Sequence, residues 1–209
     1  MYVNNPYAQA GWHNPENPFS INDGPWHPNA LHAPTFGALP SPTNCPQSIL
    51  TFEFRFGSKI GQDVLNCTVF GPRQLKFFDI QTNSFGRTII SKSGNPFAAI
   101  QWSQTQNNCT VEAKGVVALQ RVGQFLVLSQ DQRVRSMFIC GKSYTWVPRQ
   151  SGIYLYSSGP SAPEEYARAS IAQDMTGVLL EITSEAFQAG LFEPCVIATT
   201  LLFGGRRFD

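Results

Sequence analysis

Hydrophobic and polar side chains alternate along most of the chain from Ile49 onward. In the stretch 50–56, apolar side chains occupy the even positions and polar side chains the odd ones. This period of two is typical of a strand with one buried face. The other strand-like runs are Val64–Phe70, Leu75–Gln81, Arg87–Ser91, Phe97–Trp102, Cys109–Ala113, Val116–Leu119, Phe125–Leu128, Ser136–Cys140, Tyr144–Val147, Ile153–Tyr156, Tyr166–Ala172 and Val178–Ile182. About twelve or thirteen short strands with turn signals between them predict an all-β, mainly antiparallel fold, closed as a barrel or packed as a sandwich.

The pattern changes at the end of the chain. Residues 195–203 are apolar on every side, follow Glu193-Pro194 and are followed by Gly204-Gly205. Proline suits the first turn of a helix and glycine its end, so we expect a helix that is buried because it has no polar face. A helix threaded through a β-barrel would satisfy this pattern. The alternative is one more core strand, since Val, Ile and Thr favour strands.

The first 48 residues differ in kind from the rest. They hold nine of the 15 prolines and all three histidines, and apolar periodicity is missing from them. Gly11–Pro15 and Pro25–Asn29 resemble two copies of one small unit with a central Trp-His pair. We interpret residues 1–48 as an extended, proline-rich N-terminal arm and residues 49–209 as the β-domain. The arm residues expected to make contacts are Trp12, His13, Phe19, Trp26 and His27.

Charge is sparse and unevenly distributed. Charged residues make up 14% of the chain, and the formal net charge is +1. Residues 113–163 hold six basic residues against Asp131 alone, whereas residues 164–209 hold seven acidic and three basic residues. Either these segments pair in the fold, or the basic segment forms a face for anionic lipid. The candidate anionic-ligand patch consists of Arg133, Arg135, Lys142 and Arg149.

The sequence offers little catalytic chemistry. His13, His27 and His32 all lie in the arm, so the β-domain has no imidazole for a nucleophile–base pair. We expect no enzyme activity, no cofactor and no metal site. The five cysteines are widely spaced, which favours a reducing, cytoplasmic location, with attachment at the membrane periphery as an alternative. Trp102, Tyr144 and Trp146 could line a ligand pocket, but core packing is the preferred interpretation.

A set of short motifs in the β-domain has a familiar order. The motifs are Phe77–Thr82, Arg87–Ile90, Ala99–Trp102, Tyr144–Trp146, Leu179–Ile182 and the terminal pair Arg206-Arg207. Together they resemble a fungal family of unknown function related to the tubby-like and LURP-one-like barrels, a group that includes the phospholipid scramblases. The resemblance covers roughly residues 49–208 and implies a twelve-stranded closed barrel around a buried C-terminal helix. The phosphoinositide-binding residues of tubby proteins have no counterparts that can be matched here.

These patterns lead to three functional hypotheses. The first is a non-enzymatic binding or assembly module whose arm mediates homo-oligomer formation or docks a partner. The second is peripheral binding to an anionic membrane surface through the basic patch. The third is an enzyme of unfamiliar type at a barrel mouth. No nucleic-acid partner is expected, because the net charge is close to zero.

Overall fold

The computed structural model describes residues 48–57, 63–103, 108–159 and 163–208. The arm residues Trp12, His13, Phe19, Trp26 and His27 lie outside these ranges. In chain order the strands are β1 (Ile49–Phe56), β2 (Cys67–Phe70), β3 (Lys76–Thr82), β4 (Arg87–Lys92), β5 (Asn95–Gln101), β6 (Thr110–Ala113), β7 (Val117–Arg121), β8 (Val127–Leu128), β9 (Arg135–Ile139), β10 (Lys142–Arg149), β11 (Gly152–Ser157), β12 (Glu165–Ile171) and β13 (Gly177–Thr183). The helical elements are η1 (Pro72–Gln74), α1 (Val122–Phe125), α2 (Ser184–Gln188) and α3 (Phe192–Phe203). The all-β, mainly antiparallel prediction is confirmed.

The first strand shows how the alternating pattern becomes structure. Phe52 and Phe54 point to the core with 1% and 0% exposure, while Thr51 before them and Arg55 after them are exposed. β1 pairs antiparallel with β2 on one side and with β13 on the other, with Phe52 opposite Leu180. The first and last strands along the chain are therefore neighbours, and β1 is central in the sheet.

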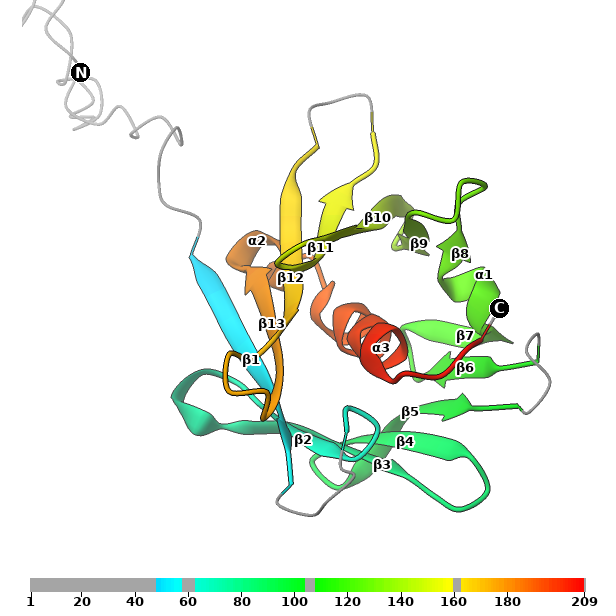
Figure 1. Cartoon of the computed structure of the whole chain (residues 1–209), viewed down its shortest axis with the longest axis vertical. Helices are drawn as coiled ribbons and strands as arrows, with labels where there is room; N and C mark the ends of the chain where they lie inside the picture. The colour runs from blue at the N-terminus through cyan, green and yellow to red at the C-terminus, as the bar shows by residue number, and fades with distance from the viewer. Residues whose placement is uncertain (1–47, 58–62, 104–107, 160–162, 209) are drawn as a thin grey trace, which may run out of the picture. The chain divides into compact units, whose positions relative to one another are not determined.

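Strands that are neighbours in the sheet are consecutive in sequence, except for the pair β1 and β13. The strand order of the sheet is β7-β6-β5-β4-β3-β2-β1-β13-β12-β11-β10-β9-β8, and all pairs are antiparallel. The sheet curves around a central helix, and its two edge strands are β7 and β8 (Figure 1). The one-turn helix α1 connects these edges. The closed barrel is not confirmed, because the described strands β7 and β8 do not pair with each other.

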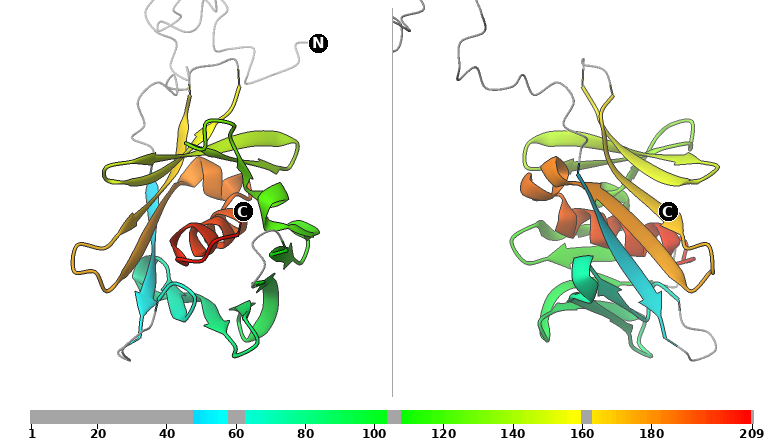
Figure 2. Two further views of the ribbon diagram at one scale, coloured as in Figure 1. Left: turned by 45° about the vertical axis from the view of Figure 1, so that its right-hand side comes forward. Right: turned by 90° about the vertical axis from the view of Figure 1, so that its left-hand side faces the viewer.

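The final apolar segment is a helix, as predicted, and it begins two residues before Pro194. α3 has 12 residues and lies inside the curve of the sheet (Figure 2). Residues 194–201 are buried without exception, so the helix needs no polar face. Inside it, the Thr200 hydroxyl donates to the Val196 carbonyl at 2.9 Å. Within the described ranges no helix has the length and apolar character that crossing a bilayer requires.

Two local differences from the sequence-based prediction have clear causes. Residues 64–66 form a turn before β2, because the Asp63 carboxylate accepts from the Leu65 backbone N–H at 2.9 Å. Phe125 ends α1 and does not begin a strand. Its side chain and that of Val122 are buried, so a single helical turn supplies two apolar side chains to the core between β7 and β8. Residues 184–188 form the short helix α2, and the Thr183 hydroxyl caps it by accepting from the Ala186 backbone N–H.

Candidate functional site

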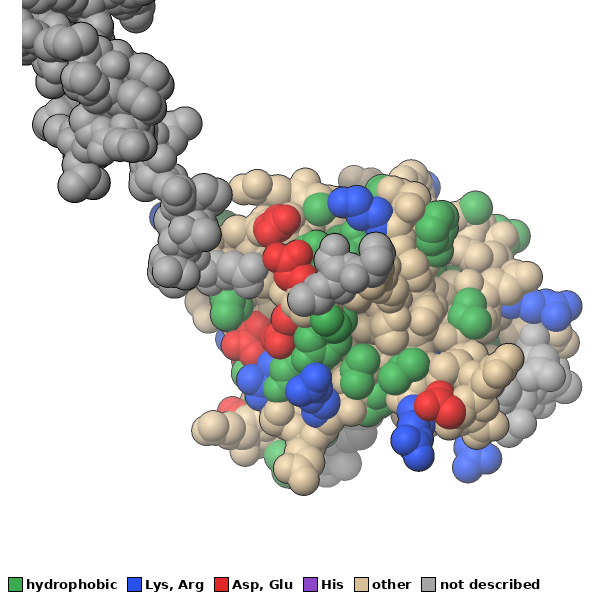
Figure 3. Space-filling view, turned by 90° about the horizontal axis from the view of Figure 1, so that it is seen from above, with side chains coloured by type: hydrophobic (Ala, Val, Ile, Leu, Met, Phe, Trp, Pro, Cys, Tyr) green, Lys and Arg blue, Asp and Glu red, His purple; other side chains and the backbone are tan. Residues whose placement is uncertain are grey.

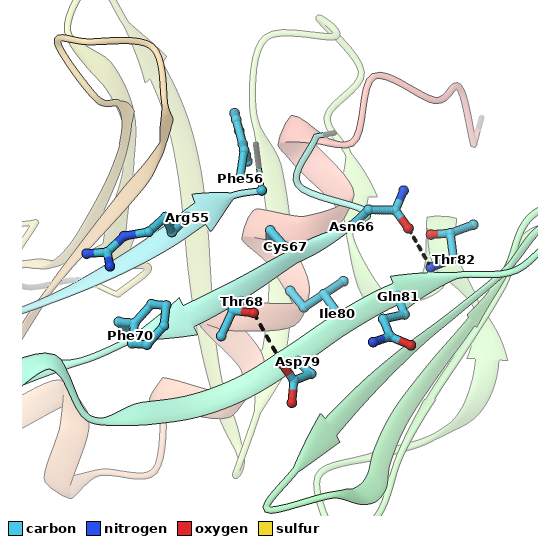
Figure 4. A pocket seen from close by; sticks show the side chains of 11 residues that line it. Arg55, Phe56, Asn66, Cys67, Thr68, Phe70, Asp79, Ile80, Gln81 and Thr82 are labelled. Carbon is cyan, nitrogen blue, oxygen red and sulfur yellow. Dashed lines mark hydrogen bonds between the residues drawn. The ribbon is translucent and has the colours of Figure 1, made fainter. Parts of the chain in front are cut away.

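A hollow of about 550 Å³ lies on the outer face of β1, β2 and β3 (Figure 4). Its charged side chains are already matched by neighbours. Arg55 lies 2.6 Å from the Glu53 carboxylate, and Asp79 lies 2.7 Å from the Lys76 ammonium group. Asp79 also accepts a hydrogen bond from the Thr68 hydroxyl at 3.2 Å. A charged ligand would have to displace one of these partners, so this hollow is a weak candidate for a binding site.

A second hollow, of about 520 Å³, is built differently. We call it the C-terminal hollow; it is lined by Ser84, Phe85, Gly86, Trp102, Ser103, Arg206 and Arg207. These residues come from the β3–β4 hairpin, the end of β5 and the segment after α3. Both arginines are exposed, and none of the ion pairs among the described residues includes either of them. Two guanidinium groups without a carboxylate give this hollow a positive charge.

The wall of the C-terminal hollow is held by a chain of hydrogen bonds. The Arg206 guanidinium lies 5.4 Å from the centre of the Trp102 ring, a cation–π distance. The buried Trp102 Nε1–H donates to the Thr88 hydroxyl oxygen at 2.7 Å. The Thr82 hydroxyl donates to the Leu65 carbonyl at 2.9 Å and lies 2.7 Å from the Thr88 hydroxyl. Because a hydroxyl has one proton, and that of Thr82 is donated to Leu65, Thr88 must donate to Thr82. The hydrogen bonds therefore run in one direction, from Trp102 through Thr88 and Thr82 to the Leu65 carbonyl.

Phe85 stands at the rim of this hollow. Its side chain is 85% exposed, the largest exposed fraction among the large hydrophobic side chains of the described residues. The hairpin that carries it is fixed by Asn83, whose side-chain oxygen accepts from the backbone N–H groups of Phe85 and Arg87 at 3.0 and 2.9 Å. Gly86 completes the turn with φ of 71°, a conformation that glycine adopts without strain. The local backbone therefore presents an aromatic ring to solvent beside two cations.

The four residues of the predicted anionic-ligand patch do not form one surface. Lys142 and Arg149 lie at opposite ends of β10, about 23 Å apart for seven strand residues. Arg135 opposes the buried Trp146; its Nη1 donates to the Leu126 carbonyl at 3.1 Å and its guanidinium stacks 4.5 Å from the Phe208 ring centre. Arg133 lies outside β9, in an exposed loop 3.9 Å from Asp131.

Only Arg133 and Arg135 of that set share a hollow. It has a volume of about 230 Å³ and also contains Trp146 and Leu202 on its wall. Arg149 instead lies over Tyr154 and Tyr156, on the outer face of β11. Arg133 precedes β9 and Arg135 is its first residue, so these two side chains do not lie along one strand.

The three aromatic candidates of the β-domain are buried, as are the thiols of Cys67 and Cys195, and Trp102 also lines the C-terminal hollow. Trp102, Tyr144 and Trp146 are 7%, 4% and 1% exposed, which agrees with the preferred interpretation of core packing. Burial raises the pKa of the Cys67 thiol to about 12, and burial also raises the pKa of Cys195. Both thiols are therefore protonated at neutral pH and are poor nucleophiles. Among the described residues, no three His, Cys, Asp or Glu side chains are grouped as metal ligands.

No family model matches the chain, and no curated protein or solved structure is significantly similar to it. The relationship to the tubby-like barrels therefore stays a prediction. Functional inference has to come from the chemistry of this chain's own surfaces.

Sequence reasoning missed the C-terminal hollow because its parts are far apart in the chain. Arg206-Arg207 entered the sequence analysis only as the last motif of the resemblance, and for Trp102 core packing was preferred over a place in a ligand pocket. Phe85 lies between two predicted strands and carried no pattern of its own. The available signal was weak: a Phe inside an Asn-Ser-Phe-Gly turn is unusual, because turns mostly contain small and polar residues.

Proposed function

We propose that the protein is a non-enzymatic binding module that attaches reversibly to anionic membrane surfaces through the C-terminal hollow and Phe85. The proposal rests on one observation. Arg206 and Arg207 form no ion pair with a carboxylate of the described residues, and they line the same hollow as Phe85, whose side chain is 85% exposed. Cations and aromatic rings suit the membrane interface together, because the cation binds the headgroup while the ring enters the acyl boundary.

The magnitudes fit a weak, reversible attachment. A Lys or Arg near an anionic membrane surface contributes about 1 kcal/mol. Burial of a Phe side chain contributes about 1.5–3 kcal/mol. Two arginines and one Phe therefore supply about 4 kcal/mol, enough for binding at millimolar accessible lipid but not for permanent anchoring. Because part of this energy is electrostatic, the attachment has to weaken as salt is added.

The space inside the curved sheet is filled by buried side chains, which favours a ligand site on the outer surface. α3 and the inward side chains of β1, β3, β10 and β13 occupy the space inside the curve, where Phe54, Phe78 and Leu180 have 0% exposure. The proposed ligand therefore meets the outside of the molecule. The hollow lies where the β3–β4 hairpin, the end of β5 and the C-terminal segment meet, and the Trp102 backbone N–H donates to the Gly86 carbonyl at 2.9 Å, which joins the end of β5 to the hairpin.

Vesicle co-sedimentation tests the proposal. The full chain is incubated with vesicles of phosphatidylcholine alone or with 30% phosphatidylserine, at low and at high salt. We expect binding only to the anionic vesicles, reduced by salt. Arg206→Gln with Arg207→Gln should weaken it by about 30-fold, which corresponds to about 2 kcal/mol. Phe85→Ser should weaken it by about 10-fold or more.

The matched control removes two exposed cations elsewhere, Arg133→Gln with Lys142→Gln. Its net charge equals that of the Arg206/Arg207 variant, so an effect of overall charge would lower both equally. Equal losses in the two variants would show that the C-terminal hollow is not the site. Binding to neutral vesicles as strong as to anionic ones would contradict the electrostatic part of the proposal.

A further inference from the structure

The direction of each strand decides which turns lie at the same end of the sheet. Gly177 opposes Arg55 in the β1–β13 ladder, so β13 begins where β1 ends. The ladders from β1 through β2 to β3 place the end of β3 on this side too. The β3–β4, β10–β11 and β12–β13 hairpins and the 129–134 loop therefore lie at one end, which we call the hairpin end. In the right-hand view of Figure 2, the β12–β13 hairpin and the C-terminal end of α3 both lie on the right.

Met175 lies in the β12–β13 hairpin, and its side chain is 73% exposed. Its backbone has φ of 56°, a left-handed conformation that Gly, Asn and Asp adopt more readily than methionine. Other groups close this turn: the Met175 backbone N–H donates to the Ala172 carbonyl at 2.9 Å, and the Asp174 carboxylate accepts from the Thr176 backbone N–H at 3.1 Å. The methionine side chain therefore contributes little to the fold and is accessible to a partner.

Phe85 is the exposed apolar side chain of the β3–β4 hairpin, at the same end of the sheet. Four strand spacings separate the β3–β4 hairpin from the β12–β13 hairpin, which is about 19 Å along the curved sheet. One small ligand would not span this distance and contact both Phe85 and Met175. An extended apolar layer can receive both side chains at once, as the acyl boundary of a membrane does.

The hairpin end is rich in basic side chains. Among the described residues, the acidic side chains in its turns, loops and strand termini are Asp63, Asp131 and Asp174. Each of these carboxylates accepts a hydrogen bond from a neighbour in its own turn. The exposed basic residues of this end are Arg87, Arg121, Arg133, Arg149, Arg206 and Arg207. Six arginines against three aspartates attract an anionic surface, including those arginines that do not touch it.

The opposite end of the sheet is close to neutral. Its basic residues are Arg73, Lys76, Lys92, Lys114 and Lys142, and its acidic residues are Glu164, Glu165, Glu185 and Glu193. Lys76 lies 2.7 Å from Asp79, and Lys92 lies 3.0 Å from Glu193. In Figure 3 most basic side chains lie along the lower edge, which faces the viewer in Figure 1, and acidic ones lie mainly toward the upper left. Exposed apolar residues such as Leu75 occur at the neutral end too, so charge distinguishes the two ends.

We propose that the whole hairpin end lies against the anionic membrane and that Met175 enters it together with Phe85. This orientation rests on the proposed membrane attachment, and it adds to the C-terminal hollow a second contact on a different hairpin. The β9–β10 turn with the exposed Cys140 lies at the opposite end and is directed away from the lipid.

A fluorescent label at each end of the full chain tests the orientation. Cys45→Ser, Cys140→Ser and Met175→Cys together place the environment-sensitive dye NBD at position 175. The control chain has Cys45→Ser alone, so that the dye reacts with the exposed Cys140; the thiols of Cys67, Cys109 and Cys195 are buried. With the phosphatidylserine vesicles, NBD emission at position 175 should shift to the blue and rise by about 2-fold or more, because the dye leaves water for the acyl boundary. Emission from Cys140 should stay unchanged.

Two unlabelled variants make the test independent of the dye. Met175→Asn suits the left-handed backbone, so the midpoint of denaturant unfolding should stay the same or rise. Its binding to anionic vesicles should nevertheless weaken by about 10-fold, because an apolar side chain no longer enters the membrane. Leu75→Asn is the matched control: Leu75 is 58% exposed at the neutral end, and its vesicle binding should equal that of the unsubstituted chain.

The possible outcomes separate the orientation from the attachment itself. If the chain binds vesicles while the dye at position 175 stays in water, the orientation is wrong and attachment through the C-terminal hollow stands. The same conclusion follows if Met175→Asn and Leu75→Asn lose equal affinity. A blue shift at Cys140 would show that the opposite end meets the lipid and would also overturn the orientation. Failure of the unsubstituted chain to bind anionic vesicles would overturn both proposals.

Discussion

Thr88 connects the interior of the sheet to the C-terminal hollow. Its hydroxyl is fully buried, accepts from Trp102 Nε1–H and donates to Thr82, which in turn donates to the Leu65 carbonyl. The Trp102 indole therefore makes one hydrogen bond, and its acceptor is held in turn by the bonds from Thr88 to Thr82 and from Thr82 to Leu65. The Arg206 guanidinium lies 5.4 Å from the centre of that indole, so Thr88 supports the ring on which an exposed cation rests.

The substitution Thr88→Val tests this connection with almost no change of shape. It leaves the buried Trp102 N–H without an acceptor, which costs about 1–3 kcal/mol of unfolding free energy. Denaturant unfolding followed by tryptophan fluorescence measures the loss. The same change at an exposed strand position, Thr51→Val, should alter stability by less than about 0.5 kcal/mol. An equally small effect for Thr88→Val would mean that the Trp102–Thr88 hydrogen bond contributes little to stability. In the Thr88→Val, Trp102→Phe pair the losses should not be additive, because both partners are then removed together.

At the scale of elements, α3 is joined to the sheet by a cluster of phenylalanines. The Phe192 ring at the start of α3 lies 4.0 Å from the Phe52 centroid, 5.6 Å from Phe77, 5.7 Å from Phe78 and 5.3 Å from Phe187. These partners belong to β1, β3 and α2. One side chain thus connects the last helix to strands near the beginning of the domain.

Truncation of Phe192 should therefore loosen α3 as a unit. Phe192→Ala is expected to cost about 3–5 kcal/mol, the range for a buried aromatic residue. Phe187→Ala removes the same atoms from a site that is 36% exposed and should cost about half as much or less. Thermal and denaturant unfolding of both variants provides the comparison. Equal costs would show that Phe192 has no special role in fixing α3.

Elements were easier to predict from the sequence than the sites. β1 and α3 were predictable because one pattern, alternation or all-round apolarity, extends over seven or more residues. α1 has four residues, too few for a helical period to appear, so Phe125 was assigned to a strand. The C-terminal hollow unites residues 84–86, 102–103 and 206–207, and no local pattern records which strands become neighbours. The patch of Arg133, Arg135, Lys142 and Arg149 is divided for a related reason: Arg133 lies in the loop before β9, Arg135 opposes Trp146, and Lys142 and Arg149 lie at opposite ends of β10.

At the scale of the whole molecule, the sheet has a cyclic strand order interrupted once. β1 and β13 pair over seven positions and join the two ends of the domain, whereas β7 and β8, neighbours in sequence, are the two edges. β8 has only two residues, and α1 takes up the chain between the edges. A very short edge strand and a covering helix are common protections against pairing with another chain. The interruption therefore lies in the middle of the sequence, where local contacts can replace strand pairing.

Hydrogen exchange measured by NMR distinguishes this open sheet from a closed barrel. Backbone N–H groups in the β1–β13 ladder have partners on both sides of each strand and should exchange only through global unfolding. Outward-facing N–H groups of β7 and β8 have no strand partner at the edge and should exchange at least 100-fold faster, through local opening. Protection of β7 and β8 equal to that of β1 would mean that the edges pair in solution and the barrel closes. Faster exchange at β1 than at the edges would contradict the strand order itself, because the β1–β13 ladder would then be the least stable part of the sheet.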